Sequence, residues 1–286
     1  MYPLQGAFFM NTVDVSVVVT TRNEERHIAA CLESVRRQKT FPREHIEIIV
    51  VDNHSTDGTV GIARRMADAV YSHGPERSSQ RNFGVEKSRG KYALVLDADM
   101  TLSDGVVREC CDLCEHEGHI ALFIPERVTG TGFWIRVRDF ERVFYNATCI
   151  DAVRFINREV FLKSGGYDLS LTGPEDWDLD RRLAGAGTFG IVSSPLFHNE
   201  GAFSLGSYLQ KKAYYAGNFD AYAAKWGTHD PVIRKQLGFR YRYYGVFIEH
   251  GKWTRLIRHP VLTLGMYALR FMVGVLYLAR VKHNGS

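Results

Sequence analysis

The chain has 286 residues, 45% of them hydrophobic and 24% charged, which is typical of a globular protein and excludes a disordered or fibrous one. Its formal net charge of +4 is too small to indicate nucleic acid, so no nucleic-acid partner is expected. The five cysteines are an odd number at spacings that suit no disulfide framework, which favours free thiols in a reducing, cytoplasmic setting. Cys111 and Cys114 form a C-x-x-C pair, interpreted as two thiols on one helix because no second pair or histidine cluster completes a zinc site.

The first hundred residues alternate between buried-strand and helix patterns. Short apolar runs predict strands over residues 13–20, 46–51, 69–72 and 92–96, and helical periodicity predicts helices over 24–38, 59–67 and 78–87. This alternation predicts an α/β fold with a mostly parallel, doubly wound sheet that is covered by helices on both faces. Ligands of such sheets bind at the carboxyl ends of the strands, where the polar segments 20–23, 52–53 and 97–99 fall.

The second half of the chain is less regular. Strands are expected over 120–125 and 152–157, with a final strand over 190–192, and residues 129–132 are expected to form a loop. Helices are expected over 136–144, 159–164 and 176–184. After Gly201 the strand patterns stop, and residues 203–226 form an aromatic, lysine-bearing helical region. The sequence therefore predicts a boundary near residue 202.

Asp97 and Asp99 follow a predicted strand directly, with one alanine between them. Two nearby carboxylates repel each other and raise each other's pKa, so a divalent cation between them is a physical reason for the arrangement. Magnesium and manganese prefer oxygen ligands and share them with substrate phosphates. A solvated acidic turn is the alternative interpretation of the triplet taken alone.

Other polar residues fall at neighbouring strand ends. Asp52 can accept hydrogen bonds from a base or ribose, whereas Asp57 and Thr59 are typical of a turn that caps the next helix. Arg77 and Arg81 lie around the start of a predicted helix, where they would meet a diphosphate or simply form a solvated basic face.

A second polar cluster lies at residues 173–178. Asp176 stands at the start of a predicted helix, where the helix dipole favours an ionised carboxylate, and this is what a general base needs. Capping of the helix is the alternative. His198 follows the expected final strand, and beside two carboxylates it would be a third metal ligand.

Five segments occur in the order found in one known family. They are VSVVVTTRNEE (15–25), EIIVVDNHSTDGT (47–59), RNFGVEKSRGKYALVLDAD (81–99), GGYD (165–168) and EDWDLDRRL (175–183). The chain resembles the family 2 glycosyltransferases of the GT-A fold, a Rossmann-like α/β architecture, over roughly residues 13 to 200. The resemblance implies a catalytic domain at 1–202, with a nucleotide-sugar half at about 13–100 and an acceptor half at about 101–202, and a helical extension at 203–286.

The resemblance also implies a role for each polar residue. The nucleoside would be bordered by Thr20, Arg22 and Glu24, with the base held by Asp52. Arg22 stands where many relatives carry an aromatic residue, so stacking on the base is not expected. The remaining implied roles are Arg77 or Arg81 at the base or diphosphate, Asp97 at the ribose and metal, Asp99 and His198 at the metal, Asp176 as general base, and Glu175 in positioning the acceptor.

These roles imply an inverting enzyme that uses Mn²⁺ or Mg²⁺ and moves one sugar from a nucleotide-diphosphate sugar, usually a UDP-sugar. The Gln-x-x-Arg-Trp motif of the processive synthases is absent from the sequence, which favours single-sugar addition to a glycan or polyprenyl-linked acceptor. The alternatives are a nucleotidyltransferase that makes nucleotide sugars and a binding scaffold with a retired site. A nucleotidyltransferase would normally carry a Gly-rich, basic loop after the first strand, and residues 20–25 are not such a loop. Intact Asp97, Asp99, Asp176 and His198 argue against a retired site.

The C-terminal segment 261–279 has nineteen residues and one charge, Arg270. Nine Leu, Phe and Val residues favour membrane insertion by about 0.3 to 0.6 kcal/mol each. A central arginine opposes insertion by about 2.5 to 3.5 kcal/mol, so the free energy of inserting this segment as a spanning helix is close to zero. A less apolar stripe on one helical face favours a helix at the membrane interface over a span, and a helix packed on the catalytic domain is the third interpretation. The stripe is Thr263, Tyr267, Arg270, Gly274 and Tyr277.

Basic residues flank this segment and would favour anionic lipid headgroups. They are Lys252, Arg255, Arg258, Arg280 and Lys282. We therefore expect peripheral contact through 252–283 with the inner face of the cell membrane. Lys211 and Lys212, among Tyr208, Tyr214 and Tyr215, would meet a donor or lipid phosphate or form a solvated helix face.

Overall fold

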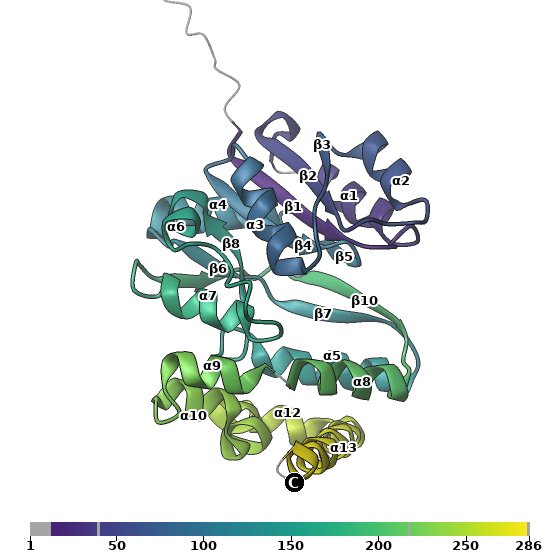
Figure 1. Ribbon diagram of the computed structural model, residues 1–286, viewed down its shortest axis with the longest axis vertical. Coiled ribbons are helices and arrows are strands. Elements are labelled where there is room, and N and C mark those ends of the chain that lie inside the picture. The colour runs from purple at the N-terminus through teal and green to yellow at the C-terminus, as the bar shows by residue number, and fades with distance from the viewer. Residues whose placement is uncertain (1–12, 39–40, 217, 285–286) are drawn as a thin grey trace, which may run out of the picture.

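The structure is a computed structural model that describes residues 13–38, 41–216 and 218–284, with only the backbone of the last helix described beyond residue 275. A seven-stranded sheet, a three-stranded sheet and a layer of helices follow one another down the long axis of the molecule (Figure 1). This arrangement confirms the predicted α/β class.

The large sheet has the strand order β3-β2-β1-β4-β8-β6-β9. Its parallel half consists of β1 (Val15–Thr21), β2 (Ile46–Asp52), β3 (Ala69–Ser72) and β4 (Tyr92–Asp97), which confirms the four strands predicted in the first hundred residues. β8 (Val153–Asn157) pairs antiparallel with β4 and with β6 (Ala121–Phe123), and β9 (Phe189–Ile191) runs parallel to β6. The strand order reverses at β1, which is where sheets of this kind bind ligands.

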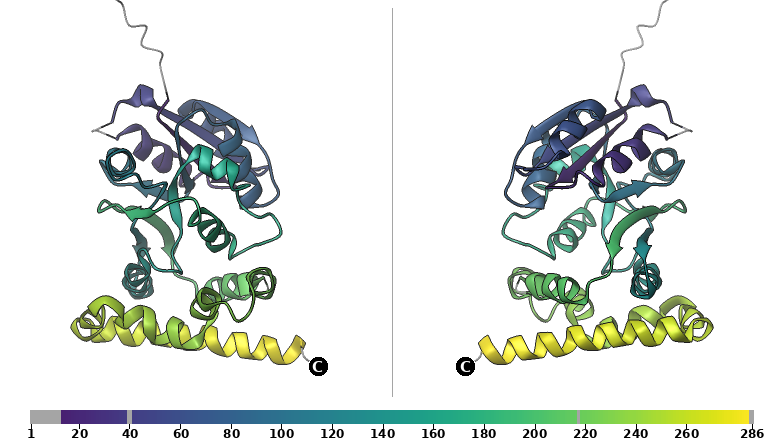
Figure 2. Two further views of the ribbon diagram at one scale, coloured as in Figure 1. Left: turned by 90° about the vertical axis from the view of Figure 1, so that its left-hand side faces the viewer. Right: turned by 90° about the vertical axis from the view of Figure 1, so that its right-hand side faces the viewer.

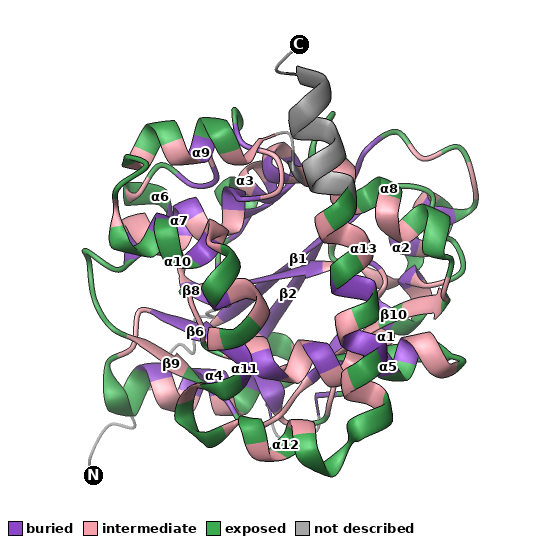
Figure 3. Cartoon of the chain, turned by 90° about the horizontal axis from the view of Figure 1, so that it is seen from below, coloured by how far each residue is buried: buried purple, intermediate pink, exposed green. Residues whose placement is uncertain are grey.

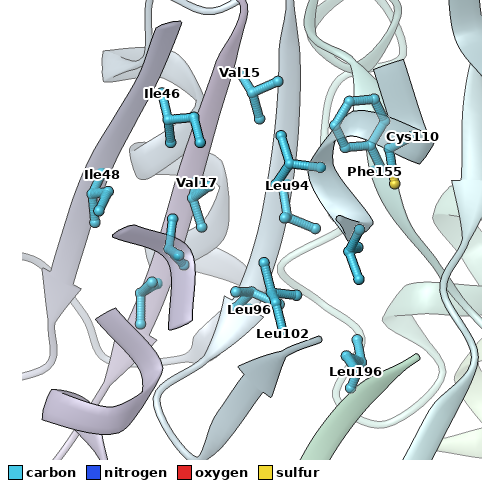
Figure 4. Close-up of a cluster of buried hydrophobic side chains, with 14 of the residues drawn as sticks. Val15, Val17, Ile46, Ile48, Leu94, Leu96, Leu102, Cys110, Phe155 and Leu196 are labelled. Atoms are coloured by element: carbon cyan, nitrogen blue, oxygen red, sulfur yellow. The ribbon is translucent and has the colours of Figure 1, made fainter. Parts of the chain in front are cut away.

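Helices cover both faces of this sheet, so β1 and β2 are buried along their whole length and consist largely of valine and isoleucine. One face is covered by α1 (Ile28–Arg36), α2 (Thr59–Met66) and α4 (Val106–Glu117), and the other by α3 (Arg77–Lys87), α6 (Arg158–Lys163) and α7 (Glu175–Leu183). Cys110 of α4 packs in the first of these cores, beside Leu94 and Phe155 (Figure 4). All five cysteines are free thiols, as expected.

The small sheet contains strands that the sequence did not predict. It has the order β5-β10-β7, made of β5 (Met100–Leu102), β10 (Leu196–Ala202) and β7 (Glu126–Thr131). The prediction of a loop over 129–132 was wrong, and so was the prediction that 190–192 is the final strand. β7 and β10 are partly exposed and poor in β-branched apolar residues, so they lack a strand pattern. They approach closely at two glycines: a Cβ on Gly130 would lie 2.1 Å from the carbonyl oxygen of Gly201.

The helical layer lies beyond the small sheet (Figure 2). It begins with α5 (Phe133–Arg142) and continues with α8 (Leu205–Ala216), α9 (Phe219–Trp226), α10 (Pro231–Leu237), α11 (Val246–Ile248), α12 (Trp253–Arg258) and α13 (Pro260–Asn284). A π-helix at Tyr241–Gly245 and single 3-10 turns at Arg43–His45, Val143–Tyr145 and Glu249–Gly251 complete the elements. Met266 and Leu269 of α13 pack in one cluster with Val137 and Phe144, so the extension shares a core with the region before the predicted boundary at 202. That boundary stays a prediction.

Among the described parts of the chain, no helix is long and apolar enough to cross a bilayer. Of the predicted less apolar stripe on α13, Arg270 is buried and Thr263, Tyr267 and Gly274 are half-buried, while Tyr277 lies outside the described side chains. Tyr267 donates a hydrogen bond to the Tyr243 carbonyl oxygen at 3.0 Å. The stripe therefore faces the rest of the protein, and the opposite side of α13 faces outward (Figure 3).

Candidate active site

The carboxyl ends of β1, β2 and β4 bring the predicted site residues together. In the register of the sheet Thr20 lies beside Asp97, and Thr21 lies beside Asp52. The Thr20 hydroxyl donates to Asp97 Oδ1 at 2.9 Å, so the threonine supports the carboxylate. The prediction that polar residues at three strand ends lie at one edge of the sheet is confirmed.

Asp97 is held by two arginines. Arg81 Nη2 donates to its Oδ1 at 3.1 Å, and Arg77 Nη1 lies 3.6 Å from its Oδ2. Burial alone would raise the pKa of Asp97, but Arg81 and then Arg77 outweigh burial and hold the pKa well below its ordinary value. Asp97 is therefore an ionised carboxylate in this geometry, and its predicted contacts with ribose and metal stay predictions.

Arg81 connects Asp97 to the predicted general base. Its side chain is 3% exposed, and Nη1 donates to Asp176 Oδ1 at 3.0 Å. Its Cζ atom lies 5.3 Å from the centre of the Tyr167 ring. Burial lowers the pKa of Arg81, but Asp97 and Asp176 raise it well above its ordinary value, so the guanidinium stays charged. The interpretation of Arg81 as part of a solvated basic face is wrong, because this side chain lies inside the molecule.

Asp99 and His198 meet as the sequence predicted, although they lie far apart in the chain. His198 Nε2 lies 3.2 Å from Asp99 Oδ2, and His198 Nδ1 lies 3.1 Å from Glu126 Oε1. Burial would lower the pKa of His198, but hydrogen bonds to Asp99 and Glu126 raise it to about 10. The other carboxylate oxygen of the aspartate, Asp99 Oδ1, is buried and has no hydrogen-bond partner. An unpaired buried carboxylate oxygen is costly, and a metal ligand is one explanation for it.

The residues around Asp99 fit a divalent cation that is also bound by substrate. Within the part of the chain that the structure describes, no three His, Cys, Asp or Glu side chains are arranged to hold a metal by themselves. Asp99 Oδ1 and His198 Nε2 nevertheless give one oxygen and one nitrogen ligand, and magnesium-type sites use one or two carboxylates plus substrate phosphates. A metal-ligating histidine usually donates its second N–H to a carboxylate, which is the position of Glu126.

The predicted base and its neighbour open α7. Asp176 is 31% exposed, whereas Glu175 is buried and accepts a hydrogen bond from the Gly173 amide. Burial and then the adjacent Asp176 raise the pKa of Glu175. Asp176 is thus accessible to an acceptor, and Glu175 holds the loop that precedes the helix.

Arg77 joins the site to α8. Its Nη2 donates to the Tyr215 hydroxyl at 2.8 Å and lies 4.0 Å from Glu175 Oε1. Burial lowers the pKa of Arg77, but Asp97 raises it above its ordinary value overall. The Arg77 side chain thus contacts the site carboxylates while 40% of its surface stays exposed.

Asp52 and Glu24, two of the residues predicted to bind the nucleoside, bond to nearby residues of their own segments. The Asp52 carboxylate accepts hydrogen bonds from the Ser55 amide at 2.9 Å and the Ser55 hydroxyl at 2.5 Å, so it organises its own turn. Glu24 lies 2.7 Å from His27 Nδ1, and Arg22 is exposed. Asp57 accepts from the Thr59 amide at 3.0 Å, which confirms the predicted turn and cap chemistry.

Comparison with known proteins identifies the class of protein. A model of glycosyl transferase family 2 matches residues 16–168. A PGL/p-HBAD biosynthesis glycosyltransferase of Mycobacterium bovis is 27% identical over 177 residues, which cover 58% of this chain and 68% of that relative. Glycosyltransferase AglE of Haloferax volcanii is 38% identical over 92 residues, 30% of each chain.

Two solved structures share the fold. Staphylococcus aureus TarS 1–349 in complex with UDP has a TM-score of 0.57 at 17% identity, covering 82% of this chain and 75% of that one. The mannosyltransferase PcManGT of Pyrobaculum calidifontis, in complex with GDP-Man and Mn²⁺, has a TM-score of 0.60 at 19% identity, covering 96% of this chain and 81% of that one. The chain covers only 46% of the longer TarS chain.

The chain belongs to glycosyl transferase family 2, since the family model matches more than half of it, and its fold is the GT-A fold. It is therefore an enzyme of the glycosyltransferase class, which sets aside the nucleotidyltransferase alternative.

Proposed function

We propose that this enzyme transfers one sugar from a UDP-sugar to an acceptor hydroxyl, with inversion at the anomeric carbon and with the help of Mn²⁺ or Mg²⁺. The observation that carries the proposal is the buried guanidinium of Arg81, which bonds both to Asp97 on the donor side and to Asp176. One rigid side chain thus sets the spacing between the proposed donor site and the proposed base.

In the proposed reaction Asp176 takes the proton of the acceptor hydroxyl as its oxygen attacks the anomeric carbon. A new C–O bond forms as the bond to the diphosphate oxygen breaks, so the electron pair leaves with the nucleotide diphosphate. Arg77, half-exposed at the edge of the site, faces the charge that develops on the leaving group. A divalent cation bound by Asp99 and His198 would supply Lewis-acid stabilisation of the same diphosphate.

The choice of UDP rests on the family resemblance and on the relative TarS, which has been solved with UDP and with UDP-GlcNAc. PcManGT, by contrast, has been solved with GDP-Man. Asp52 is the proposed contact to the base, with Thr20, Arg22 and Glu24 bordering the nucleoside. Base binding would displace the Ser55 hydroxyl from Asp52 or share the carboxylate with it.

The catalytic proposal is tested with two carboxamide variants, Asp99→Asn and Asp176→Asn. UDP release from a panel of UDP-sugars with Mn²⁺ is expected to fall roughly 10²-fold to 10⁴-fold in Asp176→Asn, because the proton acceptor is lost. Calorimetry should show that UDP binding with Mn²⁺ survives in Asp176→Asn and is lost in Asp99→Asn. Asp220→Asn, on the exposed side of α9, removes the same charge away from the site and should change neither measurement. Equal loss of UDP binding in both site variants, or full turnover without metal, would contradict these roles.

We further propose that the enzyme works at the inner face of the cell membrane on a glycan or polyprenyl-linked acceptor, in cell-surface glycan assembly. Support comes from the side of α12 and α13 that faces away from the protein. Its large apolar side chains form what we term the outer stripe: Ile257, Val261, Leu264, Phe271 and Val275. Leu264 is 73% exposed and Phe271 is 69% exposed. Large apolar side chains gathered on one face mark an interaction surface.

Basic side chains at one end of the outer stripe favour an anionic bilayer as its partner. Arg255 and Arg258 are exposed on α12, and Lys252 is half-buried and donates to the Phe144 carbonyl oxygen at 2.8 Å. The side chains of Arg280 and Lys282 lie outside the described residues. Polybasic segments beside an apolar helix face attract anionic lipid headgroups.

A further inference from the structure

A cluster of four cations around Glu141 lies about one turn of α8 from the proposed active site. We call it the cationic cluster; its members are Arg138, Lys212, Arg242 and Arg270. Tyr208, Lys212 and Tyr215 are spaced four and three residues apart, so they lie on one face of α8. Tyr215 contacts the site through Arg77 and lies against the loop before Asp176, since a Cβ on Gly173 would be 3.1 Å from Tyr215 Cβ. Lys212 is three residues back, about 4.5 Å along the helix axis. The face of α8 therefore runs from the active site directly into the cluster.

The Glu141 carboxylate in this cluster already has three partners. Glu141 of α5 is 2% exposed and is bound by Arg138 at 2.8 Å, by Arg270 of α13 at 2.5 Å and by the Tyr145 hydroxyl at 2.5 Å. Arg138 also pairs with Glu200 at 3.1 Å. The pKa of Glu141 falls to about 2 because Arg270 and Arg138 outweigh its burial, so the carboxylate is fully ionised.

Two further cations in the cluster have no carboxylate of their own. Lys212 Nζ lies 5.5 Å from the centre of the Tyr208 ring, and Arg242 Cζ lies 5.8 Å from the centre of the Trp177 ring. Among the residues that the structure describes, neither cation forms an ion pair with Asp or Glu within 4.0 Å. Burial and then Arg138 lower the pKa of Lys212 to about 7, and burial also lowers the pKa of Arg242. Like charges packed together in this way are stabilised by an anion.

The position of Arg242 indicates which substrate would supply that anion. Arg242 lies against Trp177, the residue that directly follows the proposed base, whereas the donor diphosphate would have its own cation in Arg77. The anion would therefore belong to the acceptor. A phosphate carries up to two negative charges and matches the fork of an arginine.

We propose that Lys212 and Arg242 bind a phosphate group of the acceptor, so that the enzyme glycosylates a phosphorylated acceptor. The inference rests on the proposed function, since it takes Asp176 as the base that faces the acceptor. The phosphate would belong either to a lipid, which suits a cluster that includes Arg270 on the inner side of the helix carrying the outer stripe, or to a water-soluble polyol phosphate. Both sources share the same chemistry at the site.

The test compares phosphorylated probes with the matching alcohols on the full chain. Farnesyl phosphate and farnesol in detergent micelles form the lipid arm, and glycerol 3-phosphate and glycerol form the soluble arm. Calorimetry is expected to show at least tenfold tighter binding of one phosphate than of its alcohol. The arm that shows this difference identifies the source. Equal binding of phosphate and alcohol in both arms overturns the proposal.

Variants then connect the binding to the two cations. The double variant Lys212→Gln/Arg242→Gln should lose at least tenfold in affinity for the phosphate probe, while Lys212→Arg, which keeps the charge, should retain most of it. Lys211→Gln is the matched control, because Lys211 is exposed on the same helix. Unchanged phosphate affinity in a double variant with wild-type circular dichroism also overturns the proposal. UDP binding with Mn²⁺ by the wild-type enzyme is measured separately: its absence would count against the proposed function, whereas its presence without phosphate binding would count against this inference alone.

Discussion

Glu126 illustrates, at the scale of one residue, how a side chain would shape the proposed metal site without binding the metal. Its Oε1 faces His198 Nδ1, and its Oε2 accepts from Arg142 at 3.3 Å and from Arg154 at 3.1 Å. Burial would raise the pKa of Glu126, but Arg142 and the hydrogen bond to His198 hold it well below its ordinary value. An ionised carboxylate fixed at Nδ1 favours the tautomer that leaves Nε2 free for a metal.

We therefore expect Glu126→Gln to weaken Mn²⁺ binding about 10-fold to 100-fold, since this is the usual effect of losing such a carboxylate. The measurement is the free Mn²⁺ signal in electron paramagnetic resonance, with saturating UDP present. Glu200→Gln is the control, because Glu200 lies on the same strand as His198 but pairs with Arg138. Unchanged Mn²⁺ affinity in Glu126→Gln would show that the contact with His198 has no part in metal binding.

The sequence predicted the candidate-site residues that follow buried apolar strands, and His198 beside Asp99, but it predicted neither Glu126 nor the two contacts of Arg81. Asp97 and Asp99 were recognisable because they follow a buried strand and occur in order with Asp176. Glu126 stands alone at the start of a largely polar strand, so nothing local marks it. Its contact with His198 depends on how β7 pairs with β10. Likewise, the two bonds of Arg81 depend on where α3 lies relative to the end of β4, for Asp97, and to α7, for Asp176.

At the scale of elements, the contrast between the two sheets explains which strands could be predicted. The parallel strands of the large sheet are buried on both faces, so they appear as uninterrupted apolar runs. β10 contains a histidine, an asparagine, a glutamate and a glycine, because one of its faces carries site residues and the other is half-exposed. A strand that serves the site in this way loses the pattern by which strands are recognised.

The C-terminal helix is attached to α5 by a charged pair inside the protein. Arg270 is 7% exposed, and its partner Glu141 has an ordinary pKa of 4.5 when exposed and about 2 in the folded state. A carboxylate whose pKa is lower in the folded state stabilises the fold above its unfolded pKa, and this stabilisation is lost as the pH falls through the folded value. The contribution of the pair is therefore complete above about pH 4.5 and declines between pH 4.5 and pH 2.

We expect Glu141→Gln to lower the free energy of unfolding by about 3 kcal/mol at pH 7, because the variant leaves buried Arg270 without its charged partner. The difference from wild type should shrink as the pH is lowered from 5 to 3. Urea unfolding followed by tryptophan fluorescence at several pH values measures it. The isosteric exchange Glu117→Gln on the exposed end of α4 is the control. A difference that does not vary with pH would mean that the pair adds nothing through its charge.

At the scale of the whole molecule, α13 lies at the end of the molecule opposite the large sheet, with other helices of the helical layer between them (Figure 2). The outer stripe of α12 and α13 is therefore remote from the candidate site. The inner side of α13 holds its polar contacts to the protein, and the outer side is apolar, which is the reverse of a helix on a water-facing surface. A bilayer covering the outer stripe would bury these side chains and leave the catalytic sheet in water.

Replacing Leu264 and Phe271 together by serine should reduce co-sedimentation with anionic liposomes by tenfold or more, since each buried side chain of this size contributes about 1.5 to 3 kcal/mol. Leu169→Ser is the control, because Leu169 is also an exposed leucine, at 59%, and lies outside α12 and α13. Binding should be weaker to zwitterionic liposomes if Arg255 and Arg258 contribute. Unchanged sedimentation of the double variant, together with a shift from dimer to monomer in light scattering, would instead mean that a second copy of the chain covers the outer stripe.

The contact between Glu141 of α5 and Arg270 of α13 has a practical consequence for purifying the enzyme. Removing the segment after residue 202 to obtain a smaller catalytic fragment would take away Arg270, and with it Met266 and Leu269, which share a core with Val137 and Phe144. The fragment would expose an apolar patch and leave Glu141 with only one of its two arginine partners, Arg138, so we expect it to aggregate during purification. Expression trials should therefore keep the C-terminal helix and improve solubility with detergent or polar surface substitutions.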